Sequence, residues 1–181
     1  METTEQKSLY THSLTVGGIF GAAYTIVNLL ILYIAVGTGS TGLGMIAVYC
    51  LGICGISLAA GYFATWTYIS DIMMPIETGQ GALIGFLAGI ALAVVSFVFQ
   101  LVLNSVGLDS QELTSEFMMA FLSDLGLSGQ ELQDVEDQMQ SSGSGVFSLL
   151  ISMVVLGLLN CITGLIAASI HSKKYKQTDA L

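Results

Sequence analysis

The fold is decided by the stretch Gly81-Ala82-Leu83-Ile84-Gly85-Phe86-Leu87-Ala88-Gly89-Ile90-Ala91-Leu92-Ala93. Small residues recur at every fourth position, as Gly81, Gly85, Gly89 and Ala93. On a helix this spacing places them in one shallow groove along a single face. The groove lies within an apolar run, 82–99, that has no charged residue. Helices in lipid associate where small residues let their backbones approach closely, so the stretch predicts a membrane helix that packs tightly against another helix.

The composition places most of the chain in a membrane. Of its 181 residues, 54% are hydrophobic and only 9% are charged, whereas soluble domains carry about 25% charged residues. Arginine is absent and there are four lysines, so the chain lacks the basic patch that neutralises nucleic-acid phosphates. We therefore expect the lipid bilayer as the main surroundings and no nucleic acid as a partner.

Four apolar runs are long enough to cross a bilayer, which takes about 20 residues. We expect spans over 14–36, 43–68, 81–106 and 146–170. The predicted fold is an all-α integral membrane protein, a four-transmembrane-helix bundle that forms a single membrane domain over 1–181. The first run is too long for the core of a cleaved signal peptide, so it is interpreted as a retained span.

Further small residues predict helix-packing faces in the other spans. Gly17 and Gly21 form a GxxxG pair that opens the first span much as Gly81 and Gly85 open the third. This similarity hints at two hairpins arranged as a parallel repeat. Besides the small residues of the 81–93 stretch, the predicted packing positions are Gly17, Gly21, Gly52, Gly157 and Gly164.

The segment 107–145 is the one sizeable region outside the predicted spans, and it holds eight of the thirteen acidic residues and no lysine. Two capping boxes, Asp109 with Glu112 and Ser128 with Glu131, predict a pair of short amphipathic helices between the third and fourth spans, with Gly126 ending the first. Their apolar stripes pack on the bundle's own end or on the membrane surface, or else face a partner. The stripe residues are Leu113, Phe117, Phe121, Leu125, Leu132 and Val135.

The lysines predict the orientation. All four, Lys7, Lys173, Lys174 and Lys176, lie near the two termini, and four spans put both termini on one side of the membrane. By the positive-inside rule that side is the cytoplasm, and the acidic segment 107–145 is extracytoplasmic. The expected location is therefore the inner (plasma) membrane, with a multi-pass topology.

Asn28 and Asn160 are the polar residues that matter most within the spans. No acidic, basic or histidine side chain falls at the middle of any span, which argues against a proton-coupled transporter. The two asparagines are interpreted first as interhelical hydrogen-bonding residues. The alternative is a polar pocket for a lipid, a quinone or a small substrate.

The sequence predicts no catalytic residue, no metal site and no cofactor. Nucleophile, zinc and phosphate-loop motifs are missing. An EF-hand register that starts at Asp124 puts Gly129 at the sixth position but Val135 at the twelfth, where glutamate is needed. His12 and His171 fall at the predicted cytoplasmic border, an ordinary place for histidine, and metal or haem ligation would need them buried and oriented.

The glycine-bearing first span, the third span with Gly81 and Gly89, the amphipathic segment before the fourth span and the lysine tail together resemble a group of small bacterial inner-membrane proteins with four spans and no assigned activity. The resemblance covers most of the chain. It implies a shared architecture and a bacterial origin, and it implies no mechanism.

From the residues themselves, the predicted function is that of a non-enzymatic membrane protein that acts through helix–helix association. It would be an accessory or structural subunit of a larger membrane complex, or a homo-oligomer, so the expected partners are other membrane subunits or a second copy. The alternative is a small passive transporter or channel with a polar path near Asn28 and Asn160. An enzyme acting on lipid or quinone has only the two histidines and the acidic segment to support it.

Overall fold

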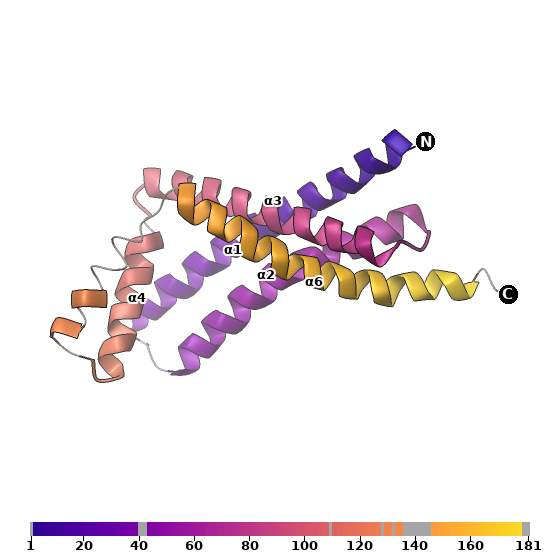
Figure 1. The fold of residues 1–181 in the computed structure, drawn as a ribbon. Coiled ribbons are helices and arrows are strands. Elements are labelled where there is room, and N and C mark those ends of the chain that lie inside the picture. Colours follow the sequence, from indigo (N-terminus) through magenta and orange to yellow (C-terminus); the bar gives the residue numbers. More distant parts are fainter. Residues whose placement is uncertain are drawn as a thin grey trace.

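The computed structural model describes residues 2–39, 43–108, 110–127, 129–131, 133–135 and 146–178. Over these residues the chain is helical and contains no strand. The long elements are α1 (Glu2–Thr38), α2 (Leu43–Ile72), α3 (Thr78–Ser105), α4 (Ser110–Asp124) and α6 (Val146–Thr178), as Figure 1 shows. Residues 130–131 and 133–135, between α4 and α6, are also helical.

Four of these helices are long and apolar enough to cross a membrane. Their candidate spans are Leu9–Thr38, Gly44–Ile72, Thr78–Ser105 and Phe147–Ser172. The prediction of an all-helical chain with four apolar helices of spanning length is therefore confirmed. α1 and α6 extend beyond the predicted spans, to Glu2 and Thr178, because a helix can continue past the end of its apolar run.

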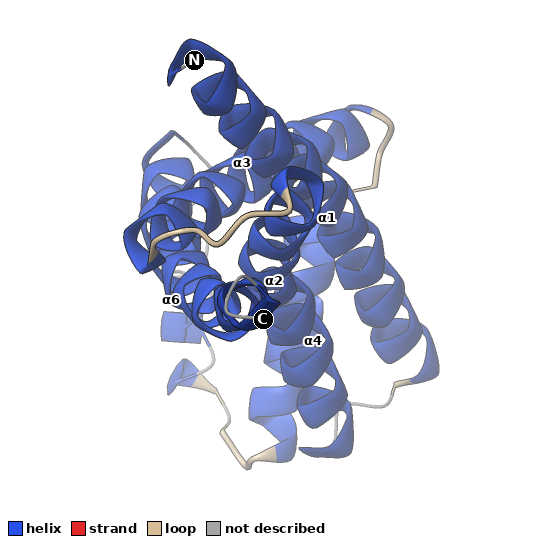
Figure 2. Cartoon of the chain, turned by 90° about the vertical axis from the view of Figure 1, so that its right-hand side faces the viewer, coloured by secondary structure: helices blue, strands red, loops and turns tan. Residues whose placement is uncertain are grey.

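The four long helices surround one axis in the order α1, α2, α6, α3. α1 and α6 each contact both α2 and α3, and α2 also touches α3 across the middle. Over the described residues α1 and α6 make no contact with each other. α1 and α3 run in one direction while α2 and α6 run in the other, so the two chain ends lie at the same end of the bundle, which faces the viewer in Figure 2.

The bundle is tight at one end and open at the other. We call the end with the chain termini the terminal half (9–21, 57–72, 78–92 and 157–172) and the end with α4 the α4 half (25–38, 44–52, 96–105, 147–156 and α4). A core in the terminal half draws on all four long helices and consists of Leu9, Ala64, Tyr68, Ile69, Ile76, Ile84, Ala88 and Ala168. In the α4 half, by contrast, residues 44–52 of α2 and 147–156 of α6 include none that is fully buried. Figure 1 shows α2 and α6 diverging toward α4.

Two glycines with left-handed backbone end α3 and α4. The φ angle is +82° at Gly107 and +90° at Gly126. After α3, the N–H of Leu108 donates to the carbonyl of Leu103 at 3.0 Å, and after α4 the N–H of Leu127 donates to that of Leu122 at 3.1 Å. These bonds are those of a Schellman motif. Gly126 thus ends α4 as predicted, while the predicted capping residues 109 and 128 lie outside the described residues.

The connection between α2 and α3 is fastened to α6. α2 ends at Ile72, ahead of Pro75, and Met73 has a φ of +51°. The N–H of Ile76 donates to Ser172 Oγ at 3.1 Å, and the Ser172 hydroxyl donates to the carbonyl of Ile76 at 3.0 Å. A single buried serine of α6 therefore replaces both hydrogen bonds that this non-helical residue would otherwise make to water.

Candidate functional site

The glycines of α1 lie against α3. A Cβ atom added at Gly21 would lie 2.8 Å from the carbonyl oxygen of Leu92 and 3.1 Å from Val95 Cβ. At Gly17 it would meet the backbone of Ala88 and would lie 2.8 Å from Ala91 Cβ. The two separations of 2.8 Å, one at Gly21 and one at Gly17, are too short for a real Cβ atom. These two positions therefore require glycine if α1 and α3 are to keep their spacing.

The glycine stripe of α3 faces α6. A Cβ added at Gly89 would lie 2.7 Å from the carbonyl carbon of Leu156 and 2.9 Å from Gly157 Cα. At Gly85 it would meet the backbone of Asn160, and at Gly81 it would meet Ala168 Cβ. Ala93 is buried at the end of the same stripe.

The facing glycines belong to α6. A Cβ added at Gly164 would meet the backbone of Gly81, and one added at Gly157 would lie 2.8 Å from the ring of Phe86. Glycines of α3 therefore pack directly on glycines of α6, and the two backbones approach without side chains between them.

In α2 the close contact is made by Gly61, which the sequence analysis does not single out. A Cβ there would meet Asn160 and would lie 2.6 Å from Thr163 Oγ1. Gly52, the predicted packing residue of α2, is only half-buried, and a Cβ there would lie 3.3 Å from Ile31 Cδ1. The missed signal is the fourfold spacing of the small residues Ser57, Gly61 and Thr65, all of which are buried.

Asn160 joins three helices in the part of the terminal half nearest the middle of the bundle. Its side chain is fully buried. Oδ1 accepts a hydrogen bond from the N–H of Gly61 at 2.6 Å, and Nδ2 donates to the carbonyl of Leu156 at 2.8 Å. Its backbone carbonyl lies where a side chain at Gly85 would be. Both the oxygen and the nitrogen of the Asn160 side-chain amide are thus used in hydrogen bonds within the bundle.

Asn28 lies apart from Asn160, in the α4 half. It belongs to α1, and α1 and α6 make no contact over the described residues. The structure therefore does not bring the two asparagines together. Asn28 is only 7% exposed, yet its Oδ1 makes no hydrogen bond within the described part of the chain.

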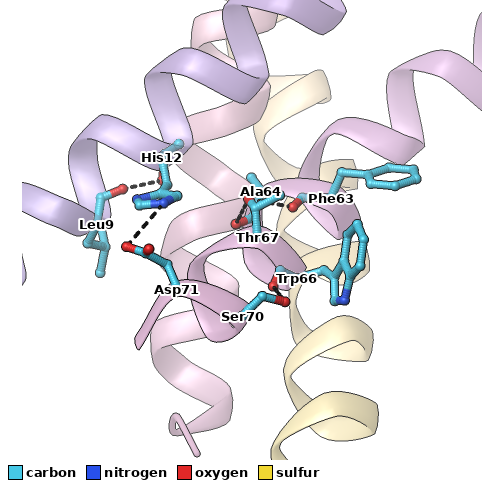
Figure 3. Close-up of polar contacts among 9 residues, drawn as sticks. Leu9, His12, Phe63, Ala64, Trp66, Thr67, Ser70 and Asp71 are labelled. Atoms are coloured by element: carbon cyan, nitrogen blue, oxygen red, sulfur yellow. Dashed lines mark hydrogen bonds and ion pairs between the residues drawn. The ribbon is translucent and has the colours of Figure 1, made fainter. Parts of the chain in front are cut away.

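The two histidines occupy the terminal end, each beside α2 and on different sides of it. His12 Nε2 lies 3.7 Å from Asp71 Oδ2 (Figure 3). The His12 ring also meets the ring of Tyr68 edge-on, with 5.8 Å between the ring centroids. His171 Nε2 lies 2.8 Å from the hydroxyl oxygen of Tyr62, within hydrogen-bonding distance. The histidines thus join α1 and α6 to α2.

The apolar stripe of α4 lies partly on the chain's own bundle. Phe117 is 5% exposed and packs with Leu32 and Ala35 of α1, and the half-buried Leu113 packs on the same cluster. Phe121 and Val135 are half-buried, while Leu125 is 55% exposed. The predicted stripe residue at position 132 lies outside the described residues. Leu113 and Phe117 therefore anchor α4 to α1, and of the described stripe residues Leu125 is the one left exposed.

Polar chemistry is sparse in the part of the chain that the structure describes. There, no group of three or more His, Cys, Asp or Glu side chains is placed to hold a metal ion. The cysteines are free, with Cys50 and Cys54 exposed and Cys161 half-buried. No family model, curated protein or solved structure matches the chain. Two features of the described residues are the candidate sites: the exposed face of α2 and the buried amide of Asn28.

Proposed function

We propose that this chain is a non-enzymatic multi-pass membrane protein that acts through helix–helix association, as a subunit of a larger membrane complex or as a homo-oligomer. The observation that carries the proposal is a set of small residues on the uncovered side of α2. This open α2 face contains the small residues Gly44, Ala47, Cys54 and Gly55 together with the larger Leu51, all of them exposed.

Glycine at these positions has no use within the single chain. A Cβ added at Gly44 or Gly55 would meet nothing within 4 Å, in contrast to one added at Gly17, Gly85 or Gly157. A lipid tail does not need a small residue beside it, whereas a second helix does. Glycine also costs helix stability relative to alanine. Two exposed glycines eleven residues apart lie on one helix face after about three turns, and this supports a close contact with another helix.

The association test is the mass of the assembly extracted in mild detergent. We expect complexes heavier than the 19.0 kDa chain, made of identical copies or containing other subunits in fixed ratio. Gly55→Leu should release single chains, while Val154→Leu, at an exposed position of α6, should leave the complex intact. Monomeric wild-type chain in native lipid would contradict the proposal.

Cys54 offers a second test without a foreign label. In a Cys50→Ser, Cys161→Ser background, mild oxidation in membranes should link two chains through Cys54 if two open α2 faces meet. Adding Gly55→Leu should abolish that link. If other proteins co-purify and Cys54 does not link two chains, the chain is a subunit of a larger complex and not a homo-oligomer.

We further propose that the chain lies in the inner membrane with both termini in the cytoplasm and 107–145 outside. The four lysines near the termini support this orientation. In a cysteine-free background, Glu116→Cys of α4 should react with a membrane-impermeant maleimide on intact cells. Ser70→Cys, at the terminal end of α2, should react only after lysis. The reverse pattern would overturn the orientation.

A second candidate function is a small passive transporter or channel near Asn28 and Asn160. The unpaired Oδ1 of Asn28 supports it, whereas both ends of the Asn160 amide are already bonded. After transfer to hyperosmotic glycerol or urea, vesicles that contain the chain should regain their volume faster than empty vesicles, because the solute enters them. Asn28→Leu should lower this recovery rate to that of empty vesicles. Equal rates for wild type and empty vesicles would exclude these solutes as cargo.

A further inference from the structure

Cys50 and Cys54 are two exposed thiols on neighbouring turns of α2. They are four residues apart in one helix, and both are free and exposed. Cysteine is among the residue types most often found fully buried, and a buried free cysteine packs as a small apolar residue. A packing role inside the single chain therefore does not account for this exposed pair.

The spacing of the two thiols suits a bridging metal ion better than a disulfide bond. Residues four apart on a helix have their Cβ atoms about 5–6 Å apart, whereas a disulfide needs about 3.5–4.5 Å between them. Two metal–sulfur bonds of about 2.3 Å each let the two sulfur atoms lie up to about 4.6 Å apart. One metal ion can therefore join Cys50 and Cys54 while α2 stays helical.

The number of ligands decides which metal ion the pair can hold. Among the residues that the structure describes, no group of three or more His, Cys, Asp or Glu side chains is placed to hold a metal ion. Zinc takes four ligands in structural sites, so the two thiols of one chain do not complete a zinc site. Thiolate sulfur is a soft ligand that selects Cu(I), and two sulfur ligands in line are a complete coordination shell for that ion.

The apolar surroundings of the pair favour a complex without net charge. Residues 43–68 of α2 include no charged side chain, and an isolated charge in an apolar medium is costly. One thiolate and one neutral thiol around a monovalent cation give an uncharged complex. Its formation from Cu(I) and two thiols makes two copper–sulfur bonds, breaks one S–H bond and releases one proton, with no change of oxidation state.

Two tyrosine hydroxyls lie near the thiols. The Tyr49 hydroxyl is close enough to both thiols to interact with them electrostatically, and the Tyr24 hydroxyl of α1 is close enough to that of Cys54. The Tyr49 ring lies against Phe117 of α4, with 5.8 Å between the ring centroids. A tyrosine O–H can donate to sulfur, and such a bond is stronger when the sulfur is ionised. These hydroxyls can therefore stabilise the thiolate of the pair.

We propose that Cys50 and Cys54 form a two-coordinate site for a soft monovalent metal cation, Cu(I). Because both thiols are exposed, the ion reaches them from outside the bundle and needs no internal cavity. Cys54 also belongs to the open α2 face, but one chain supplies both ligands, so the inference does not depend on association.

The test is an anaerobic competition for Cu(I) between the purified chain in mild detergent and bicinchoninate, a chelator whose Cu(I) complex is coloured. We expect the wild-type chain to take up one Cu(I) per chain. Cys50→Ser and Cys54→Ser should each weaken binding about a hundredfold or more, because the second thiol of the pair acts at a high effective concentration. Cys161→Ser, which removes the thiol outside the pair, is the matched control and should bind as the wild type does. No uptake by the wild type, or equal affinity in wild type and Cys54→Ser, would overturn the proposal.

Two further measurements separate a site within one chain from a site shared between chains. X-ray absorption of the bound copper should show two sulfur neighbours, and three or four would contradict the two-coordinate site. Gly55→Leu should keep the Cu(I) affinity of the wild type even where it releases single chains, so failure of the association proposal and failure of this one are distinguishable. Loss of Cu(I) binding in a folded Gly55→Leu chain, as judged by Trp66 fluorescence, would show that one chain does not suffice.

Discussion

The terminal half and the α4 half of the bundle use the same residue types in different ways. In the terminal half, Gly85 and Gly89 bring α3 onto the backbone of α6, and Gly61 brings α2 onto Asn160. In α2 outside the terminal half, a Cβ added at Gly44 or Gly55 would meet nothing within 4 Å. A small residue in a membrane helix is therefore not a contact by itself. It becomes one only where a partner helix is held within reach.

The two asparagines show the same difference. Both ends of the fully buried Asn160 amide are hydrogen-bonded, whereas the buried Asn28 Oδ1 has no hydrogen-bond partner among the described residues. We interpret Asn160 as a structural residue that holds the helices of the terminal half together, and Asn28 as a residue available for function.

Gly85→Leu should break the terminal half. The new side chain would start inside the backbone of Asn160, and α3 and α6 would have to separate, at a cost of about 3 kcal/mol or more. The measurement is thermal unfolding in detergent followed by the fluorescence of Trp66, the single tryptophan. Gly37→Leu, at an exposed position of α1 where an added Cβ would meet nothing within 4 Å, is the matched control and should change stability by less than about 0.5 kcal/mol.

Phe117→Ala should free α4 without loosening the terminal half. The ring is buried against Leu32 and Ala35, and its removal should cost about 3 kcal/mol of local stability. Hydrogen exchange should speed up in 110–124 and stay unchanged in 81–92. Exposed Leu125→Ala is the control. Equal protection of α4 in wild type and Phe117→Ala would mean that this contact does not hold the helix.

Asn160→Leu and Asn28→Leu should act in opposite directions. The first removes two buried hydrogen bonds and should cost about 2 kcal/mol, since the amide's backbone partners lose their contacts. The second removes an unsatisfied acceptor and should be neutral or slightly stabilising. Unfolding by either denaturant or heat reports the difference. A larger loss of stability from Asn28→Leu than from Asn160→Leu would contradict the division of roles.

Tyr62→Phe should have the smallest effect. It removes the contact of 2.8 Å with His171 and should cost about 1 kcal/mol, as for a typical single hydrogen bond. The ring contacts with Phe63 and His171 remain possible. The expected result is a small drop in the unfolding midpoint with no change in the mass of the assembly.

Much of the fold could be predicted from local patterns. Hydropathy alone located four apolar helices, since a span has a fixed minimum length. The fourfold spacing of Gly81, Gly85 and Gly89 marked a face for close packing, and Gly126 marked a helix end. These features depend on neighbours along one helix, which a sequence displays directly.

The candidate sites could be predicted only in part. Gly52 and Gly61 belong to the same glycine-rich helix, and only the arrangement of α6 makes Gly61 the contact. Asn28 and Asn160 each fall near the middle of a predicted span, yet the structure places them in different halves of the bundle, on helices α1 and α6 that do not contact each other over the described residues. Long-range packing decides which helices are neighbours and where two of them diverge. No pattern along a single helix indicates either.

The central claim is that α2 and α6 touch in the terminal half and separate in the α4 half. Gly61 and Asn160 set the register of these parallel helices. The pairs Phe63 with Ile162 and Val48 with Phe147 share that register, one pair in each half, and all four residues are exposed.

Spin labels on cysteines at these four positions, in a background with the native cysteines replaced by serine, give the distance for each pair in lipid nanodiscs. We expect a short, narrow distance distribution for 63–162 and a longer, broader one for 48–147. Equal and narrow distributions for the two pairs would show a uniformly packed bundle and would contradict the account.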